Sequence, residues 1–103
     1  MNDSEFIRLT DTAFARIQQG LEDADLDFEQ PADGILEVEF EDGSKMIINR
    51  HGAAREIWVA ARSGGFHFRH DGNAWRDTRD NTELFAKLIA LIAAQGGGAV
   101  DFG

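Results

Sequence analysis

The chain has 103 residues, of which 43% are hydrophobic, which predicts a single domain over residues 1–103 with a modest core. It contains no cysteine, no secretory signal and no apolar run of about 18 residues, so we expect no disulfide and no membrane span, and a cytoplasmic location. The net charge of −9 is uneven, because residues 1–42 hold 13 carboxylates against two arginines. Such a surface disfavours nucleic acid and favours cations or a basic partner protein.

The first predicted element is a helix over residues 4–24, where apolar side chains recur with a helical period. Asp3 or Ser4 is suited to cap its start. Residues 25–34 are polar and contain Pro31, the only proline, so this segment is expected to be a loop.

A strand is predicted over residues 35–41, because Leu36, Val38 and Phe40 alternate with glutamates. Asp42-Gly43 then favours a two-residue hairpin turn into a return strand over 44–50. The register expected from that turn places Glu41 opposite Ser44, Glu39 opposite Met46 and Glu37 opposite Ile48.

Further short strands are predicted over residues 56–61, 66–70 and 74–78. Asp80 followed by Glu83 resembles a capping box that would open a helix over 81–95. Gly96 to Gly98 end this helix, and the tail beyond them is expected to be loose. The whole order predicts an α+β two-layer sandwich, in which N- and C-terminal helices cover one face of an antiparallel sheet of five or six strands.

The segment LEDADLDFE, residues 21–29, concentrates negative charge where the first helix should end. The helix macrodipole is also negative there, so local rules favour Lys or Arg instead. A departure of this kind suggests a functional site, although a solvated acidic face is the alternative. Oxygen ligands suit hard cations, and without the spacing of an EF-hand we expect weak, exchangeable sites. The candidate ligands are Glu22, Asp23, Asp25, Asp27 and Glu29, extended by Glu37, Glu39 and Glu41 on the neighbouring strand.

Trp58 is the candidate anchor for a partner protein. Ile57 and Val59 claim the core side of their strand, so alternation sends the indole outward. Three histidines (His51, His67 and His70) are too scattered for a preformed metal cage, and no nucleophile or phosphate-loop motif occurs, so we do not expect an enzyme.

Five features together resemble the bacterial frataxins of the CyaY type, over essentially the whole chain. They are MNDSEF at the start, the acidic end of the first helix, FEDGSKMIINR (40–50), IWVAARSGGFHF (57–68) and Trp75. The resemblance implies an iron-binding, cytoplasmic protein that regulates iron–sulfur cluster assembly. It implies that iron and a cysteine desulfurase bind the acidic residues around 22–29, and that a cluster scaffold protein contacts the sheet through Trp58 and Asn49.

The chain departs from the family pattern at two places. Gln18 and Gln19 stand where bacterial members often carry acids, and His51, Ala53 and Glu56 replace a usual Gln, Pro and Gln before Trp58. The sequence leaves open whether the protein donates iron, senses it or inhibits sulfur transfer. It is expected to be monomeric, with iron-driven oligomers left open.

Three other functions remain as alternatives. The first is an acidic protein-interaction module with incidental metal binding, and the second is a nucleic-acid mimic. The third is a ferroxidase, which the lack of a di-iron arrangement of carboxylates and histidines argues against.

Overall fold

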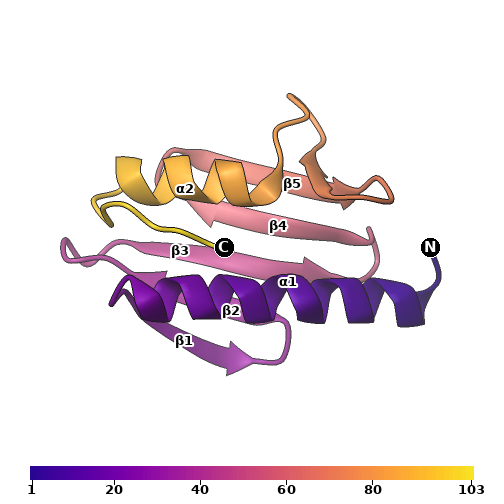
Figure 1. The fold of residues 1–103 in the computed structure, drawn as a ribbon, viewed down its shortest axis with the longest axis horizontal. Helices are drawn as coiled ribbons and strands as arrows, with labels where there is room; N and C mark the ends of the chain where they lie inside the picture. The colour runs from indigo at the N-terminus through magenta and orange to yellow at the C-terminus, as the bar shows by residue number, and fades with distance from the viewer.

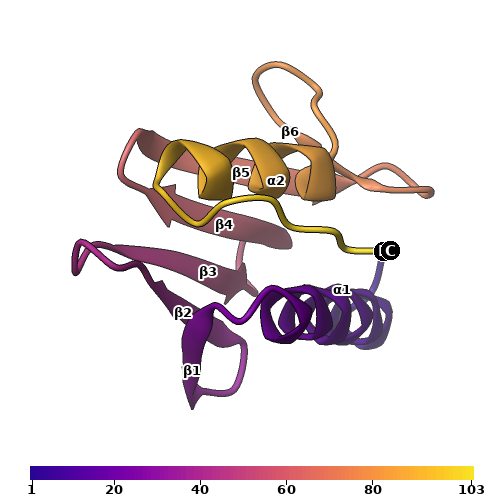
Figure 2. The same cartoon turned by 60° about the vertical axis from the view of Figure 1, so that its left-hand side comes forward.

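Two helices lie side by side over one face of a six-stranded sheet in the computed structural model, which describes residues 1–103 (Figures 1 and 2). The helices are α1 (Asp3–Asp23) and α2 (Leu84–Ala94). The strands pair antiparallel in chain order, as β1 (Asp27–Ala32), β2 (Ile35–Glu39), β3 (Lys45–His51), β4 (Glu56–Ala61), β5 (Gly64–His70) and β6 (Trp75–Asp77). The predicted two-layer α+β architecture is confirmed. Neither helix is long and apolar enough to cross a membrane.

The core lies between the helices and the covered face of the sheet. Alternate strand residues such as Leu36, Val38, Ile57 and Val59 are at most 1% exposed, as the alternation predicts. The apolar stripe of α1, which includes Ile17, packs against them. The opposite face of the sheet is uncovered, and its side chains form the sites described below.

Both helices begin differently from the prediction. The cap of α1 is Asn2, whose side chain accepts a hydrogen bond from the Glu5 amide at 2.8 Å. The cap of α2 is Glu83, so the helix starts at Leu84 rather than at residue 81. Asp80 does not cap α2 because its carboxylate accepts from the Thr82 amide and binds Lys87.

The prediction of a loop over residues 25–34 is wrong, because residues 27–32 form the edge strand β1. Phe28 packs towards the core opposite Val38, whereas the other residues of β1 are exposed. The register shifts between Glu29 and Ala32, where Pro31 lies, and this is the kind of edge position that tolerates a residue without an amide hydrogen. Proline therefore marks an irregular edge strand here and not a loop.

The predicted two-residue turn at Asp42-Gly43 is also wrong by one residue. Gly43 has φ +84°, and its amide donates to the Phe40 carbonyl, so Glu41 to Gly43 form a three-residue loop. Glu39 consequently lies opposite Lys45, and Glu37 lies opposite Ile47. This shift turns Met46 and Ile48 into the core and leaves Glu41 in the turn.

The C-terminal tail is packed and not loose as expected. It runs back between the two helices (Figures 1 and 2), where Val100 and Phe102 are 8% and 6% exposed. Arg16 donates from Nε to the Phe102 carbonyl oxygen at 2.7 Å. Gly20 lies directly against the Phe102 ring, which would overlap any Cβ at this position. The tail thus completes the helical layer.

Lys87 on α2 pairs with two carboxylates near β6. Its Nζ lies 3.1 Å from Asp77 Oδ2 and 2.7 Å from Asp80 Oδ2. The Lys87 hydrogen bond lowers the pKa of Asp80 to about 2. Burial raises the pKa of Asp77, but hydrogen bonds from the Arg79 amide and Lys87 outweigh burial and leave it lowered. Because the carboxyl pKa values are lower in the folded protein, the two charged carboxylates stabilise the fold at pH values above about 4, the pKa of an aspartate in the unfolded chain. This stabilisation is lost as the pH falls towards 2.

Lys87→Met is therefore expected to lower the free energy of unfolding at pH 7 by about 1–3 kcal/mol, because the buried Asp77 carboxylate loses its cation. It should also reduce the loss of stability between about pH 4 and pH 2, measured by urea unfolding at several pH values. The exposed Arg79, which makes no ion pair, supplies the matched control Arg79→Met. An unchanged acid profile in Lys87→Met would contradict this account.

Candidate functional site

The last turn of α1 carries Glu22 and Asp23 and contains no basic residue. The chain leaves the helix through a Schellman motif, in which the Leu26 amide donates to the Leu21 carbonyl at 3.0 Å. Asp25 occupies the left-handed position of this motif with φ +55°, where glycine is usual. An aspartate here bears both backbone strain and repulsion from the helix dipole, so its presence is not explained by stability.

Asp25→Gly is expected to raise the free energy of unfolding by about 1 kcal/mol, because it removes the strained φ angle and one misplaced charge. Denaturant unfolding measures this change. Asp25→Asn is the control. It removes the charge as Asp25→Gly does, but asparagine tolerates the left-handed conformation less well than glycine does. Lower stability in Asp25→Gly than in the wild type would show that Asp25 supports the fold.

The uncovered face of β1 and β2 places like charges directly opposite each other. Asp27 faces Glu39, and Glu29 faces Glu37, across the antiparallel pair. Such pairs destabilise a sheet. Only Lys45 compensates: its Nζ lies 2.6 Å from Glu37 Oε1, and this hydrogen bond raises the pKa of Lys45.

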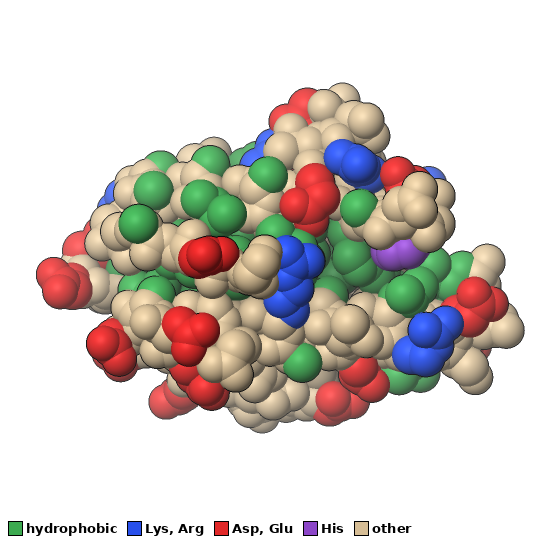
Figure 3. Space-filling model, viewed as in Figure 1, with side chains coloured by type: hydrophobic (Ala, Val, Ile, Leu, Met, Phe, Trp, Pro, Cys, Tyr) green, Lys and Arg blue, Asp and Glu red, His purple; other side chains and the backbone are tan.

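We call the eight predicted ligands the acidic ridge, and the structure brings six of them together. One hollow of about 380 Å³ is lined by Asp27, Glu29, Glu37 and Glu39, and another of about 420 Å³ by Asp25, Asp27, Glu39 and Glu41. Glu22 and Asp23 line neither hollow. Figure 3 shows acidic side chains gathered where α1 leads into β1.

The acidic ridge is largely uncompensated within the chain. Glu37 is its only member with an ion pair, and Gln19 donates to Asp23 at 2.9 Å. No three histidine, aspartate or glutamate side chains anywhere in the chain converge closely enough to hold a metal ion. A cation at the ridge would therefore be held by one or two carboxylates and by water.

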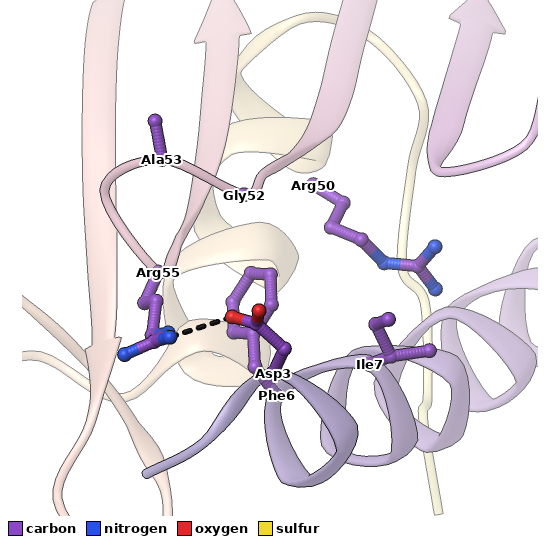
Figure 4. A pocket seen from close by; sticks show the side chains of 7 residues that line it. All are labelled: Asp3, Phe6, Ile7, Arg50, Gly52, Ala53 and Arg55. Carbon is purple, nitrogen blue, oxygen red and sulfur yellow. Dashed lines mark hydrogen bonds and ion pairs between the residues drawn. The ribbon is translucent and has the colours of Figure 1, made fainter.

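Another hollow, of about 650 Å³, lies at the start of α1 (Figure 4), and no residue of the acidic ridge lines it. Phe6 and Ile7 line it together with two arginines. Arg55 pairs with Asp3 at 2.5 Å, and Arg50 is held by Thr10, Asp11 and Asp33. Arg50 and Arg55 are thus neutralised within the chain, whereas Glu37 is the only carboxylate of the ridge that is.

Trp58 lies on the uncovered face of the sheet, as alternation predicts, but is only partly exposed. It stands in a stack of three rings, with centroids 3.6 Å from His51 and 4.5 Å from His67, both at 11° between planes. Its Nε1 donates to Glu56 Oε1 at 2.8 Å. The sequence alone missed this stack, because it depends on the register of three strands.

Glu56, which the sequence analysis noted only as a departure from the family pattern, anchors this group of side chains. It is 5% exposed and also accepts from Arg69 at 2.6 Å. Burial raises the pKa of Glu56, but the hydrogen bonds from Trp58 and Arg69 outweigh burial and leave it lowered. A charged Glu56 thus fixes the indole in one orientation at neutral pH.

Comparisons with known proteins agree with this geometry. The model of the frataxin-like domain family matches residues 1–98. The iron–sulfur cluster assembly protein CyaY of Dechloromonas aromatica is 61% identical over 102 residues, covering 97% of each chain, and that of Cupriavidus taiwanensis is 42% identical over 99% of this chain and 96% of its own.

The fold comparison gives the same result. The solved structure of frataxin from Psychromonas ingrahamii superposes with a TM-score of 0.91 at 36% identity, covering 100% of this chain and 99% of that one. The predicted resemblance is confirmed, and a family of assembly proteins agrees with the expectation that the chain is not an enzyme. From its sequence and its fold, the chain belongs to the frataxin-like family.

Proposed function

We propose that the protein is a cytoplasmic regulator of iron–sulfur cluster assembly, and that it binds iron and a cysteine desulfurase through the acidic ridge. The two relatives described above are named as the iron–sulfur cluster assembly protein CyaY. A cluster scaffold protein is the second proposed partner, on the uncovered sheet face that carries Trp58 and Asn49.

The observation that carries this proposal is the pair of like-charge contacts between β1 and β2. Asp27 opposite Glu39 and Glu29 opposite Glu37 each cost about 0.2–1 kcal/mol, and Lys45 relieves only one of them. The dipole of α1 adds to the repulsion. Cations from outside the chain would relieve both terms, which is why a binding function explains the cluster better than solubility does.

Iron fits the ridge by its ligand preference. Ferric iron is a hard cation that takes carboxylate oxygens, and ferrous iron accepts them as well. Because the side chains are exposed and do not converge, each ion would keep water in most of its coordination positions. Weak, exchangeable binding of this kind suits the transfer or sensing of iron.

The desulfurase would dock by charge. A basic patch on that enzyme complements the ridge, so the affinity should fall as salt rises. The distance that such attraction reaches is about 10 Å at 0.1 M salt, which confines it to the ridge and its immediate surroundings.

The test is a titration of the wild type and of Asp27→Asn with Glu29→Gln, using anaerobic ferrous iron and then the desulfurase. The double variant should lose at least about tenfold in affinity for each. Glu5→Gln with Asp101→Asn removes the same charge at exposed sites outside the ridge and should bind as the wild type does. Equal binding by both double variants would overturn the proposal.

A protein-interaction module with incidental metal binding is the second candidate, and it is favoured by the absence of any converging trio of ligands in the chain. The same titration separates the two. Equal desulfurase affinity with and without iron would favour the module, even if the double variant binds iron more weakly than the wild type does.

A further inference from the structure

A hollow of about 220 Å³ lies on the helical face of the protein, between α1, the β5–β6 hairpin and the start of α2. Figure 3, which views this face, shows hydrophobic side chains beside one histidine. The apolar wall of the hollow comes from Leu9, Ala13 and Phe85. A volume of this size holds about seven water molecules, or one small organic molecule. No residue of the acidic ridge lines it, and neither does Trp58.

Trp75 supplies this hollow with an unpartnered hydrogen-bond donor. The residue is 4% exposed, and its indole Nε1 makes no hydrogen bond within the chain. No side-chain nitrogen that is sealed from solvent lacks a partner, so the Nε1–H reaches solvent. Trp75 lines the hollow, which gives its N–H that opening. Because a buried indole usually finds an acceptor, a ligand oxygen in the hollow would complete the bonding of Trp75.

His70 and Arg16 line the same hollow and add two further donors. The Nδ1 atom of His70 accepts from the Gly72 amide at 3.1 Å, so the neutral imidazole carries its proton on Nε2. Arg16 uses Nε and Nη2 on two carbonyl oxygens of the C-terminal tail, which leaves Nη1 free. Its guanidinium carbon lies 3.9 Å from the centre of the Phe85 ring, and this contact holds the cation beside the apolar wall.

The charges around the hollow favour an anion. Arg16 is the cation of its lining, and Glu83 is the one carboxylate. Both oxygens of Glu83 already accept from amides in the first turn of α2, at 2.9 and 3.2 Å. The other polar side chains of the lining, Thr12 and Asn73, are uncharged. Three free N–H donors beside an apolar wall suit a carboxylate that is attached to an apolar body.

We propose that this hollow is a binding site for a small monocarboxylic acid with an aliphatic or aromatic body. The carboxylate accepts hydrogen bonds from Trp75, His70 and Arg16, and the body lies against the apolar wall. The hollow is small and is bordered by three separate elements of the fold, which favours a free acid over a segment of a partner protein. This binding is separate from the proposed iron and desulfurase binding, because the acidic ridge takes no part in it.

The experiment is a titration of the protein with sodium benzoate, followed by the two indole N–H signals in proton–nitrogen NMR spectra. The Nε1 atom of Trp58 already donates to Glu56, so its signal is an internal reference. Trp58→Phe removes that signal and thereby assigns the signal of Trp75 without altering the core. Two further probes separate the parts of the ligand, because benzamide lacks the negative charge and acetate lacks the apolar body.

Two variants test the location of the site. Asn73→Asp adds a negative charge to the lining of the hollow at an exposed residue. It leaves the fold intact, because the hydrogen bond of residue 73 to Asp71 is made by its backbone amide. Gln30→Glu is the matched control, since it adds the same charge at an exposed residue of β1, at the opposite edge of the sheet from β6.

We expect benzoate to shift the Trp75 indole signal with a Kd of about 1 mM and to leave that of Trp58 in place. Benzamide and acetate should bind at least about fivefold more weakly, as should benzoate to Asn73→Asp, whereas Gln30→Glu should bind benzoate as the wild type does.

Three results would overturn the inference. They are a Trp75 signal that stays still up to about 20 mM benzoate, an equal response to benzamide, and wild-type benzoate affinity in Asn73→Asp. A Trp75 signal that shifts with the desulfurase or the scaffold protein, but not with benzoate, would also overturn it and would assign the hollow to a protein partner.

Discussion

Replacing Phe102 with alanine is expected to lower the free energy of unfolding by about 3–4 kcal/mol, because the buried ring lies in the helical layer. The ring lies between α1 and α2, with its centroid 5.5 Å from that of Phe85 and its edge against Gly20. Removing it leaves a cavity that the rigid helical layer cannot close. Urea unfolding followed by circular dichroism measures the change.

Two further variants test this account of the tail. Asp101→Asn alters an exposed neighbour and should change stability by less than about 0.5 kcal/mol. Gly20→Ala introduces a Cβ that overlaps the Phe102 ring, so it should destabilise the protein although alanine is the better helix former. A loss below about 1 kcal/mol in Phe102→Ala, or a gain in Gly20→Ala, would show that the tail is not part of the core.

Replacing both Asp27 and Glu29 with lysine is expected to raise the free energy of unfolding by about 1–2 kcal/mol and to abolish iron binding. The two like-charge pairs with Glu39 and Glu37 become opposite-charge pairs. A like-charge pair destabilises the sheet by about 0.2–1 kcal/mol, and an opposite-charge pair stabilises it by a similar amount. Stability and function therefore change in opposite directions in one variant. Thermal unfolding and anaerobic ferrous titration of the same preparation measure both effects.

The control for this reversal is Glu5→Lys. Glu5 lies in the first turn of α1, where a negative charge is favourable, so this variant should be slightly less stable than the wild type and should bind iron normally. Lower stability of Asp27→Lys with Glu29→Lys than of the wild type would contradict the claim that the β1–β2 carboxylates repel one another.

The parts of the fold that the sequence predicted correctly are those with a regular period. The alternation of Leu36, Val38 and Phe40 and the helical stripe of residues 4–24 follow from burial of one face alone. Where a turn decided the register, prediction failed, because Asp42-Gly43 is compatible with both a two-residue and a three-residue loop. The buried tail was missed because its contacts with α1 are more than 80 residues distant in sequence.

The candidate site was predicted in part. The acidic residues are recognisable because they break the rule for the end of a helix, and Trp58 because its neighbours Ile57 and Val59 claim the core. The cross-strand pairing of Asp27 with Glu39 was not foreseen, since residues 25–34 read as a loop until Phe28 is seen to pack opposite Val38. The stack of His51, Trp58 and His67 likewise needs three strands in register.

The central claim is that the protein tolerates repulsion along the acidic ridge because positive charge from outside relieves it. An NMR titration of the backbone amides with anaerobic ferrous iron tests this most directly, since the paramagnetic ion broadens signals near its site. We predict that broadening begins at Asp25, Asp27, Glu29, Glu37 and Glu39, and spares the stack around Trp58. Unchanged ridge signals at an iron concentration that broadens the amides of His51 or His67 would contradict it.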